Sequence, residues 1–192
     1  KFGLTEKEVE TLYRFAAGHP NLRPRGLSVH IGSQLTDLTP YKQAYRKLAD
    51  LAKKMMSEGL PLESLDLGGG LGITYLNETP PDLDSYAKII KETVEPLGTE
   101  LVLEPGRFLT GAAGILLSRV SYIKESENRK FLILDTGMND LLRPALYDAW
   151  HDIIPIDVSE ARTTSQYDIV GPICETGDTF AFQREMPELK SG

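Results

Sequence analysis

The segment that decides the fold is Leu65-Asp66-Leu67-Gly68-Gly69-Gly70-Leu71-Gly72, a short apolar run that leads into a series of glycines. The apolar run is typical of a buried strand, and the glycines predict a tight turn at its end. Backbone N–H groups in such a turn can approach an anion such as phosphate. A tight turn without a ligand explains this segment equally well. The spacing does not match the dinucleotide-binding fingerprint, and a phosphate-loop lysine is lacking.

Helices and short apolar strands alternate on both sides of this segment. Apolar residues recur at helical spacing in three stretches, and β-rich runs lie between them. The expected helices are Thr5 to Ala17 with a capping box of Thr5 and Glu8, Thr39 to Gly59, and Leu83 to Leu97. The expected strands, besides the one before Gly68, are Gly26 to Gly32 and Glu100 to Glu104. This alternation predicts parallel βα units, in which ligand groups gather at the C-terminal ends of the strands.

The pattern changes after about Gly111. Long helices are no longer indicated, and β-rich runs follow one another, which predicts a second and mostly antiparallel domain. The expected runs are Ile115 to Ile123, Lys130 to Asp135, Asp152 to Pro155 and Tyr167 to Ile173.

Composition excludes several classes of function. The formal net charge of −7 and the pI of about 5.1 argue against a nucleic-acid or anionic-membrane partner, because both need a basic surface. A small-molecule ligand is therefore expected. The longest apolar stretch is far shorter than the roughly 20 residues of a membrane span, and the single cysteine forms no internal disulfide, so a cytoplasmic protein is expected. The chain starts at Lys1 without methionine, and we expect it to be part of a longer protein.

Two more expected strand ends carry polar motifs. Glu104-Pro105-Gly106-Arg107 places a carboxylate and a guanidinium together, which suits a pyridinium nitrogen and a substrate carboxylate. His30-Ile31-Gly32-Ser33-Gln34 supplies an imidazole that could stack on a cofactor ring and a hydroxyl that could lie near its phosphate. Taken singly, a salt-bridged glutamate and a buried core histidine are the simpler interpretations. Three such motifs on successive strands favour a ligand site.

Two irregular stretches in the second half also contain reactive or charged residues. They are Asp135 to Tyr147, which includes Arg143-Pro144-Ala145-Leu146-Tyr147, and Gly171 to Asp178, which includes Cys174-Glu175-Thr176-Gly177-Asp178. Either could be a plain loop, and an inert thiol is the simpler interpretation of Cys174.

In this order, the five motifs resemble the diaminopimelate decarboxylase family, within the alanine-racemase-like group of pyridoxal-phosphate enzymes. The resemblance covers nearly the whole chain. It implies an α/β plus β fold: residues 1–110 form the last strands of a TIM-type (β/α)8 barrel that binds pyridoxal 5'-phosphate, and residues 111–192 form part of a mostly antiparallel β domain. It also implies a homodimer with shared active sites.

The resemblance implies a role for each motif. His30 stacks on the cofactor ring, Glu104 pairs with its pyridine nitrogen, and Arg107 contributes to both the cofactor and the substrate site. Cys174 is the proton donor, supplied across the dimer interface. The phosphate is surrounded by Ser33, Gly68, Gly69, Gly70 and Gly106, and the substrate is bound by Arg107, Arg143, Tyr147 and Glu175. No metal is expected.

The expected reaction is decarboxylation of meso-2,6-diaminopimelate to L-lysine and carbon dioxide. In this family the lysine that holds the cofactor lies on the first barrel strand, outside this chain, and a C-terminal tyrosine of the site is also absent. We therefore expect this piece alone to be inactive. Only three βα strands are indicated, whereas a closed barrel of this type needs eight, so we also expect the piece alone to be poorly stable.

The sequence is also compatible with other functions. A sister decarboxylase would act on ornithine, arginine or carboxynorspermidine, although Arg143 to Tyr147 and Cys174 to Asp178 favour diaminopimelate. A non-catalytic pyridoxal-phosphate-binding relative would have kept the fold alone, but Glu104, Arg107 and Cys174 count against it. A purely structural interaction domain would leave all five motifs unexplained.

Overall fold

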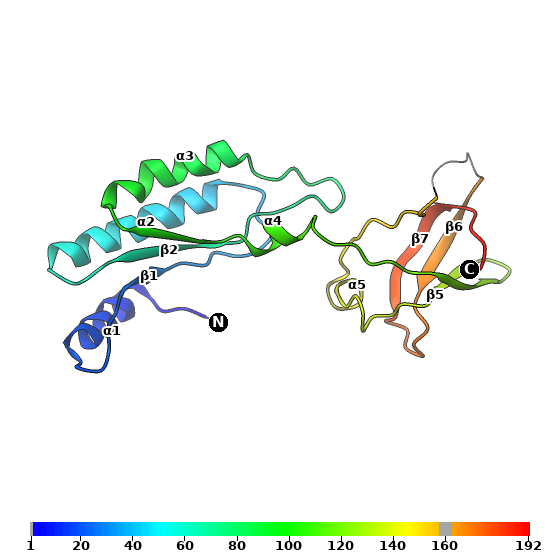
Figure 1. Cartoon of the computed structure of the whole chain (residues 1–192), viewed down its shortest axis with the longest axis horizontal. Coiled ribbons are helices and arrows are strands. Elements are labelled where there is room, and N and C mark those ends of the chain that lie inside the picture. The colour runs from blue at the N-terminus through cyan, green and yellow to red at the C-terminus, as the bar shows by residue number, and fades with distance from the viewer. Residues whose placement is uncertain (1, 158–162) are drawn as a thin grey trace. The chain divides into compact units, whose positions relative to one another are not determined.

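The computed structural model describes residues 2–157 and 163–192, and these fall into two compact units (Figure 1). The first unit comprises residues 1–74 and 78–113, and the second comprises residues 75–77 and 114–192. Each unit has its own hydrophobic core.

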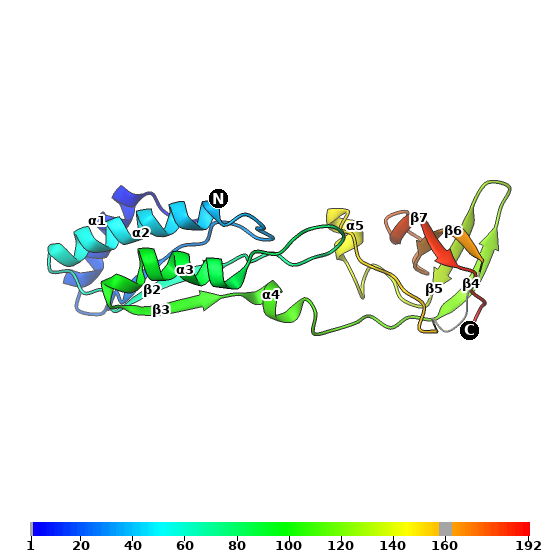
Figure 2. The same ribbon diagram turned by 90° about the horizontal axis from the view of Figure 1, so that it is seen from above.

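The first unit is a three-stranded parallel sheet with helices. Its elements are α1 (Glu6–Gly18), β1 (Gly26–Ser28), α2 (Thr39–Ser57), β2 (Ser64–Gly69), α3 (Leu83–Thr93), a 3₁₀ turn (Glu95–Leu97), β3 (Glu100–Glu104) and the short α4 (Gly106–Thr110). The strand order is β1-β2-β3, with Leu27 opposite Leu65 and Leu65 opposite Leu101. Helices α2 and α3 lie side by side along the sheet (Figures 1 and 2).

Local sequence explains where the helices begin. Thr5 caps α1, and its capping box with Glu8 is present in both directions, as predicted. Helix α2 has Pro40 in its first turn, and α3 is capped by the carboxylate of Asp82. The predicted strand and helix of each βα pair are all present, so the parallel arrangement inferred from the alternation is confirmed.

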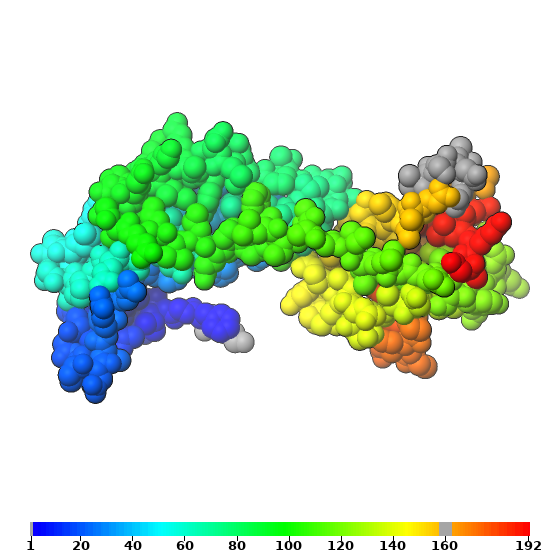
Figure 3. Space-filling model, in the orientation of Figure 1, coloured from blue at the N-terminus to red at the C-terminus, as the bar shows by residue number. Residues whose placement is uncertain are grey.

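The core of the first unit lies between the sheet and the apolar faces of α2 and α3. The fully buried side chains include Tyr41, Tyr45, Met55, Leu65 and Leu67. Strand β3 is different, because Val102 and Leu103 are 38% and 46% exposed. Both β3 and α4, in green, lie at the visible surface of this unit in Figure 3.

The second unit contains a four-stranded mixed sheet in the order β4-β5-β6-β7. Its elements are β4 (Val120–Glu125), β5 (Lys130–Leu134), α5 (Arg143–Tyr147), β6 (Thr164–Val170) and β7 (Thr179–Pro187). The outer pairs, β4–β5 and β6–β7, are antiparallel, whereas β5 and β6 are parallel. The sheet is therefore mixed, with the expected antiparallel pairing in two of its three ladders.

The predicted strands of the second half need correction. The run from Asp152 to Pro155 is not a strand; Ile154 is 72% exposed, and Ile153 packs against the core of this unit from an irregular segment. The predicted run from Ile115 to Ile123 becomes a strand only at Val120, and Ile115 is 92% exposed. The run predicted from Tyr167 is present but shifted, because β6 starts at Thr164 and ends at Val170. Strand β7 and helix α5 were not predicted.

Candidate functional site

The C-terminal ends of the three parallel strands meet at one edge of the first sheet (Figure 1). His30 and Ser33 follow β1, Gly68 and Gly69 end β2 with Gly70 directly after it, and Glu104 is the last residue of β3. The structure thus gathers at one edge the three motifs that the sequence places on successive strands. The side chains of His30, Ser33 and Glu104 are exposed there.

One hydrogen bond joins two of these strand ends directly. Arg107, in α4, donates from Nη2 to Oγ of Ser33 at 3.1 Å. Because β1 and β3 are separated by β2, this bond spans the edge of the sheet. A guanidinium and a hydroxyl held together in this way present donors for an anionic group. Gly106, directly before Arg107, begins α4 and is exposed.

The glycine turn has a structural explanation of its own. Gly68 and Gly70 have φ of 68° and 91°, a region that disfavours residues with a side chain. A Cβ on Gly68 would overlap the carbonyl oxygen of Val29, and one on Gly69 would overlap that of Glu104. Close packing of neighbouring strand ends therefore requires glycine even without a ligand. The same lack of side chains leaves the edge open for an anion.

The hydroxyl groups of buried tyrosines donate hydrogen bonds to the backbone of β2 at this turn. Tyr41 donates from its hydroxyl to the carbonyl oxygen of Gly69 at 3.1 Å, and Tyr45 donates to that of Leu67 at 3.1 Å. The Tyr45 hydroxyl also lies 2.8 Å from that of Tyr86 in α3. Burial raises the pKa of Tyr41 to about 12 and raises that of Tyr45 further. The apolar spacing predicts the helix from Thr39 to Gly59 but not this support, because helical spacing says nothing about the hydrogen-bond partner of a hydroxyl.

In the second unit, Arg143 lies among aromatic rings. Its guanidinium carbon lies 5.1 Å from the ring centroid of Tyr75, which also makes an edge contact with His151 at 5.5 Å. The Nε of Arg143 and the Nε2 of His151 are buried without a hydrogen-bond partner. Burial, and next the charge of Arg143, lower the pKa of His151. Tyr75 and His151 were missed, because irregular segments give no periodic signal.

The other residues proposed from sequence in this unit are exposed. Tyr147 ends α5 with 69% of its surface exposed, and Cys174 and Glu175 lie exposed in the loop between β6 and β7. In that loop, the carboxylate of Glu175 accepts a hydrogen bond from the backbone N–H of Gly177 at 3.1 Å. Asp178, at the end of the same loop, is only 2% exposed.

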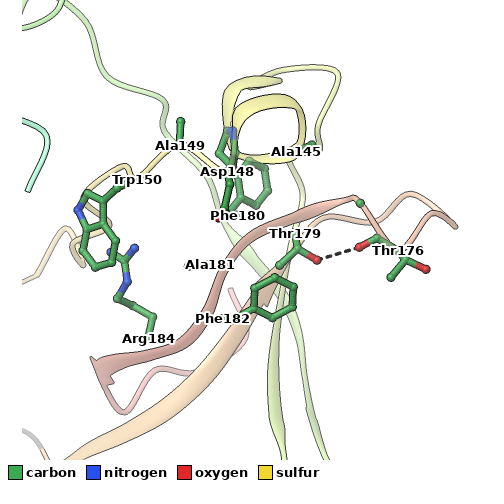
Figure 4. Close-up of a pocket in the computed structure, with 12 residues that line it drawn as sticks. Ala145, Asp148, Ala149, Trp150, Thr176, Thr179, Phe180, Ala181, Phe182 and Arg184 are labelled. Carbon is green, nitrogen blue, oxygen red and sulfur yellow. Dashed lines mark hydrogen bonds between the residues drawn. The ribbon is translucent and has the colours of Figure 1, made fainter. Parts of the chain in front are cut away.

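A cavity of about 460 Å³ lies between α5, the chain after it, and β7 (Figure 4). In it, the guanidinium of Arg184 stacks over the ring of Trp150 at 3.4 Å and donates to the carbonyl oxygen of His151 at 3.2 Å. Thr176 and Gly177 line it, whereas their neighbours Cys174 and Glu175 do not. This cavity is therefore not lined by Arg143, Tyr147, Cys174 or Glu175, the site residues predicted for this unit.

Metal-binding clusters and membrane-spanning helices are both absent from residues 2–157 and 163–192. Within these ranges, three or more His, Cys, Asp or Glu side chains nowhere come together in a way that could hold a metal ion. Within the same ranges, every helix is too short or too polar to cross a membrane.

Comparison with known proteins gives the family. Residues 17–192 match the family model described as pyridoxal-dependent decarboxylase, C-terminal sheet domain. The chain belongs to this family of pyridoxal-dependent decarboxylases.

Within the family, the chain is similar to diaminopimelate decarboxylases. That of Haemophilus influenzae is 46% identical over 187 residues, which are 97% of this chain and 45% of that protein. The crystal structure of the Helicobacter pylori enzyme complexed with L-lysine is 41% identical, with a TM-score of 0.93 over 100% of this chain and 47% of that one. A lysine/ornithine decarboxylase from Vibrio vulnificus complexed with cadaverine is 27% identical, with a TM-score of 0.89 over 100% of this chain and 52% of that one. The chain thus spans about half the length of these proteins.

Proposed function

We propose that the whole protein containing this chain decarboxylates meso-2,6-diaminopimelate to L-lysine with pyridoxal 5'-phosphate as cofactor. The observation that carries the proposal is the meeting of His30, Ser33, Glu104 and Arg107 at one edge of a parallel sheet, with Arg107 bonded to Ser33. The similarity to diaminopimelate decarboxylases supports it, and the L-lysine complex of the Helicobacter pylori enzyme supports the choice of product. A cytoplasmic location belongs to the same proposal and rests on the sequence.

The architecture proposed for the whole protein is a TIM-type (β/α)8 barrel followed by a β domain. Residues 1–110 would supply the last strands of the barrel, and residues 111–192 part of the β domain. Two features support a sheet that continues beyond three strands. In the described part of the chain, β1 and β3 pair with β2 alone, and β3 exposes the apolar residues Val102 and Leu103.

The strand-end residues fit the cofactor chemically. The glycine turn has no side chain to exclude a phosphate, and Ser33, Arg107 and Gly106 lie beside it as donors or open backbone. Glu104 is exposed at the end of β3, where its carboxylate can hold a ring nitrogen protonated. His30 would stack on the face of the ring. When bound, the cofactor supplies an electron-poor ring that accepts the electrons left by departing carbon dioxide.

Four residues would bind the substrate. Arg143 and Glu175 would bind opposite charges of the diamino dicarboxylate, with Tyr147 as a hydroxyl partner, and Arg107 would also contribute. Cys174 would return a proton to the carbon that has lost its carboxylate. The exposed position of Cys174 and Glu175 suits a site shared with a second copy in a homodimer.

Product identification tests this proposal. The purified whole protein, supplied with pyridoxal 5'-phosphate, is incubated separately with meso-diaminopimelate, L-ornithine and L-arginine, and the amines are separated on a chiral column. We expect L-lysine from the first and no amine from the others. Putrescine or agmatine as the main product would show that the protein is an ornithine or arginine decarboxylase instead. No product from any substrate would favour a non-catalytic relative.

A further inference from the structure

The carboxylate of Asp178 joins two loops of the second unit. Its Oδ1 accepts a hydrogen bond from the backbone N–H of Met138 at 2.6 Å, and its Oδ2 accepts one from Ile173 at 2.7 Å. Met138 belongs to the loop after β5, which leads to Arg143, and Ile173 directly precedes Cys174. One buried side chain thus holds the segments that carry the proposed substrate-binding and proton-donating residues.

Backbone contacts close the loop around this side chain. Gly171 donates from its N–H to the carbonyl oxygen of Asp178 at 2.9 Å, and Asp178 donates from its own N–H to that of Glu175 at 3.0 Å. The stretch from Gly171 to Asp178 is therefore a closed turn, with Cys174 near its tip.

Two glycines make room for the carboxylate. A Cβ on Gly171 would overlap the carboxylate of Asp178, and one on Gly137 would come within 3.2 Å of its Oδ1. The pocket around the carboxylate is shaped by backbone on both sides, and at 2% exposure Asp178 is shielded from water. A buried carboxylate that accepts two backbone N–H bonds is a strong and geometrically specific restraint.

We propose that Asp178 is a positioning residue that fixes Cys174 and Glu175 for the reaction. The proposal rests on the proposed function for the identity of the reaction, and on the hydrogen bonds of Asp178 for the restraint. Asp178 does not itself touch the reacting atoms. Its removal leaves the strand-end residues of the first unit unchanged, so cofactor affinity is retained while the proton-returning step slows.

The test compares D178N with D168N in the whole protein loaded with cofactor. Asp168 is a second buried carboxylate and serves as the control: it is 4% exposed, accepts a backbone N–H bond from Gln183 at 2.9 Å and lies 3.4 Å from Arg129, but it belongs to β6 and not to the loop of Cys174. An asparagine at either position replaces one acceptor oxygen by an N–H₂ donor. For D178N we expect kcat per bound cofactor to fall about tenfold or more, with cofactor affinity unchanged. For D168N we expect wild-type kcat.

A second variant covers the case in which D178N does not fold. In G137A, whose backbone φ is not positive, the new methyl group presses on the side-chain ends of Asn139 and Ile173 and comes within 3.2 Å of Oδ1 of Asp178. We expect a kcat reduced about threefold with only a small change in thermal midpoint. Wild-type kcat in every folded variant, with stability alone reduced, overturns the proposal.

A readout independent of turnover separates this proposal from the proposed function. The rate at which iodoacetamide alkylates Cys174, followed on its peptide by mass spectrometry, should change at least about threefold in D178N and not in D168N. If the wild-type protein acts on no amino acid but D178N alters this rate, the proposed function fails and the positioning of Cys174 stands. An unchanged rate in D178N overturns the positioning.

Discussion

Arg107 donates a hydrogen bond of 3.1 Å to Ser33, and so joins the chain after β3 to the chain after β1 across the end of β2. The bond places a positive charge and a hydroxyl beside a turn that has no side chains. Such an arrangement is able to bind a phosphate group, as we propose for this site.

The first prediction concerns this pair. S33A removes the hydroxyl and leaves Arg107 with fewer restraints, so we expect the dissociation constant for pyridoxal 5'-phosphate to rise about three- to tenfold. Absorbance titration of the cofactor-free whole protein measures it. S57A, at an exposed residue near the end of α2, is the control and should leave the constant unchanged. Equal affinities of S33A and S57A for pyridoxal 5'-phosphate would show that the phosphate does not bind beside Ser33.

The second prediction concerns the buried tyrosines. Y45F deprives the carbonyl oxygen of Leu67 and the hydroxyl of Tyr86 of a partner at a fully buried position. We expect the free energy of unfolding to fall by about 1–3 kcal/mol, measured by urea denaturation. Y122F, at a tyrosine that is 60% exposed in β4, should change it by less than about 0.5 kcal/mol. A similar loss in both variants would argue against a special role for the buried hydroxyl.

Much of the first unit could be predicted from sequence because its signals are local. The capping box of Thr5 and Glu8, the apolar face from Tyr41 to Met55, and the glycines after Leu67 each specify one structure. The parallel order then follows from the alternation of strands and helices. The gathering of His30, Glu104 and Arg107 at one edge is a consequence of that order.

The second unit was harder to predict because its pairings are not local. The pairing of β5 with β6 joins residues more than thirty positions apart, such as Phe131 and Asp168. The sequence of neither strand indicates which strand it pairs with. Strand β7 was missed because Gln183, with φ of 46°, interrupts the alternation of apolar residues. Helix α5 was missed because five residues are too few to show a helical period.

Candidate residues were predicted where the motif itself carried the chemistry. His30, Glu104, Arg107, Arg143 and Cys174 belong to recognisable motifs, and their roles remain predictions. Supporting contacts depend on tertiary structure. The placement of Tyr75 beside Arg143, from 68 positions away in the sequence, could not be inferred from either residue alone.

The third prediction concerns pH. Burial and the charge of Arg143 lower the pKa of His151, so the folded protein binds its proton less readily than the unfolded chain. The contribution of neutral His151 to the free energy of unfolding is therefore fully present above the ordinary pKa of about 6.5. It is lost as the pH falls through the lowered pKa of the folded protein. The urea midpoint of the wild type should therefore drop more steeply than that of H151Q between about pH 7 and pH 5. Parallel curves would contradict the lowered pKa.

The fourth prediction concerns the ring beneath Arg143. The contact between Arg143 and Tyr75 orients the guanidinium, and a cation–π contact contributes about 0.5–2 kcal/mol. Y75L should raise KM for meso-diaminopimelate several-fold, and Y75F, which keeps the ring, should restore most of the affinity. Steady-state kinetics of the whole protein give both values. A Y75F variant as impaired as Y75L would assign the effect to the hydroxyl instead.

The most direct test of the central claim is the ratio of kcat/KM for meso-diaminopimelate to that for L-ornithine, measured by carbon dioxide release from the whole protein with pyridoxal 5'-phosphate. A site built to pair both charged ends of diaminopimelate rejects a substrate that lacks the distal carboxylate, so we predict a ratio of about 10⁴ or more. A ratio near or below one would contradict the assignment of Arg143, Tyr147 and Glu175 to the distal end of the substrate. It would make the protein a decarboxylase of simple diamine precursors.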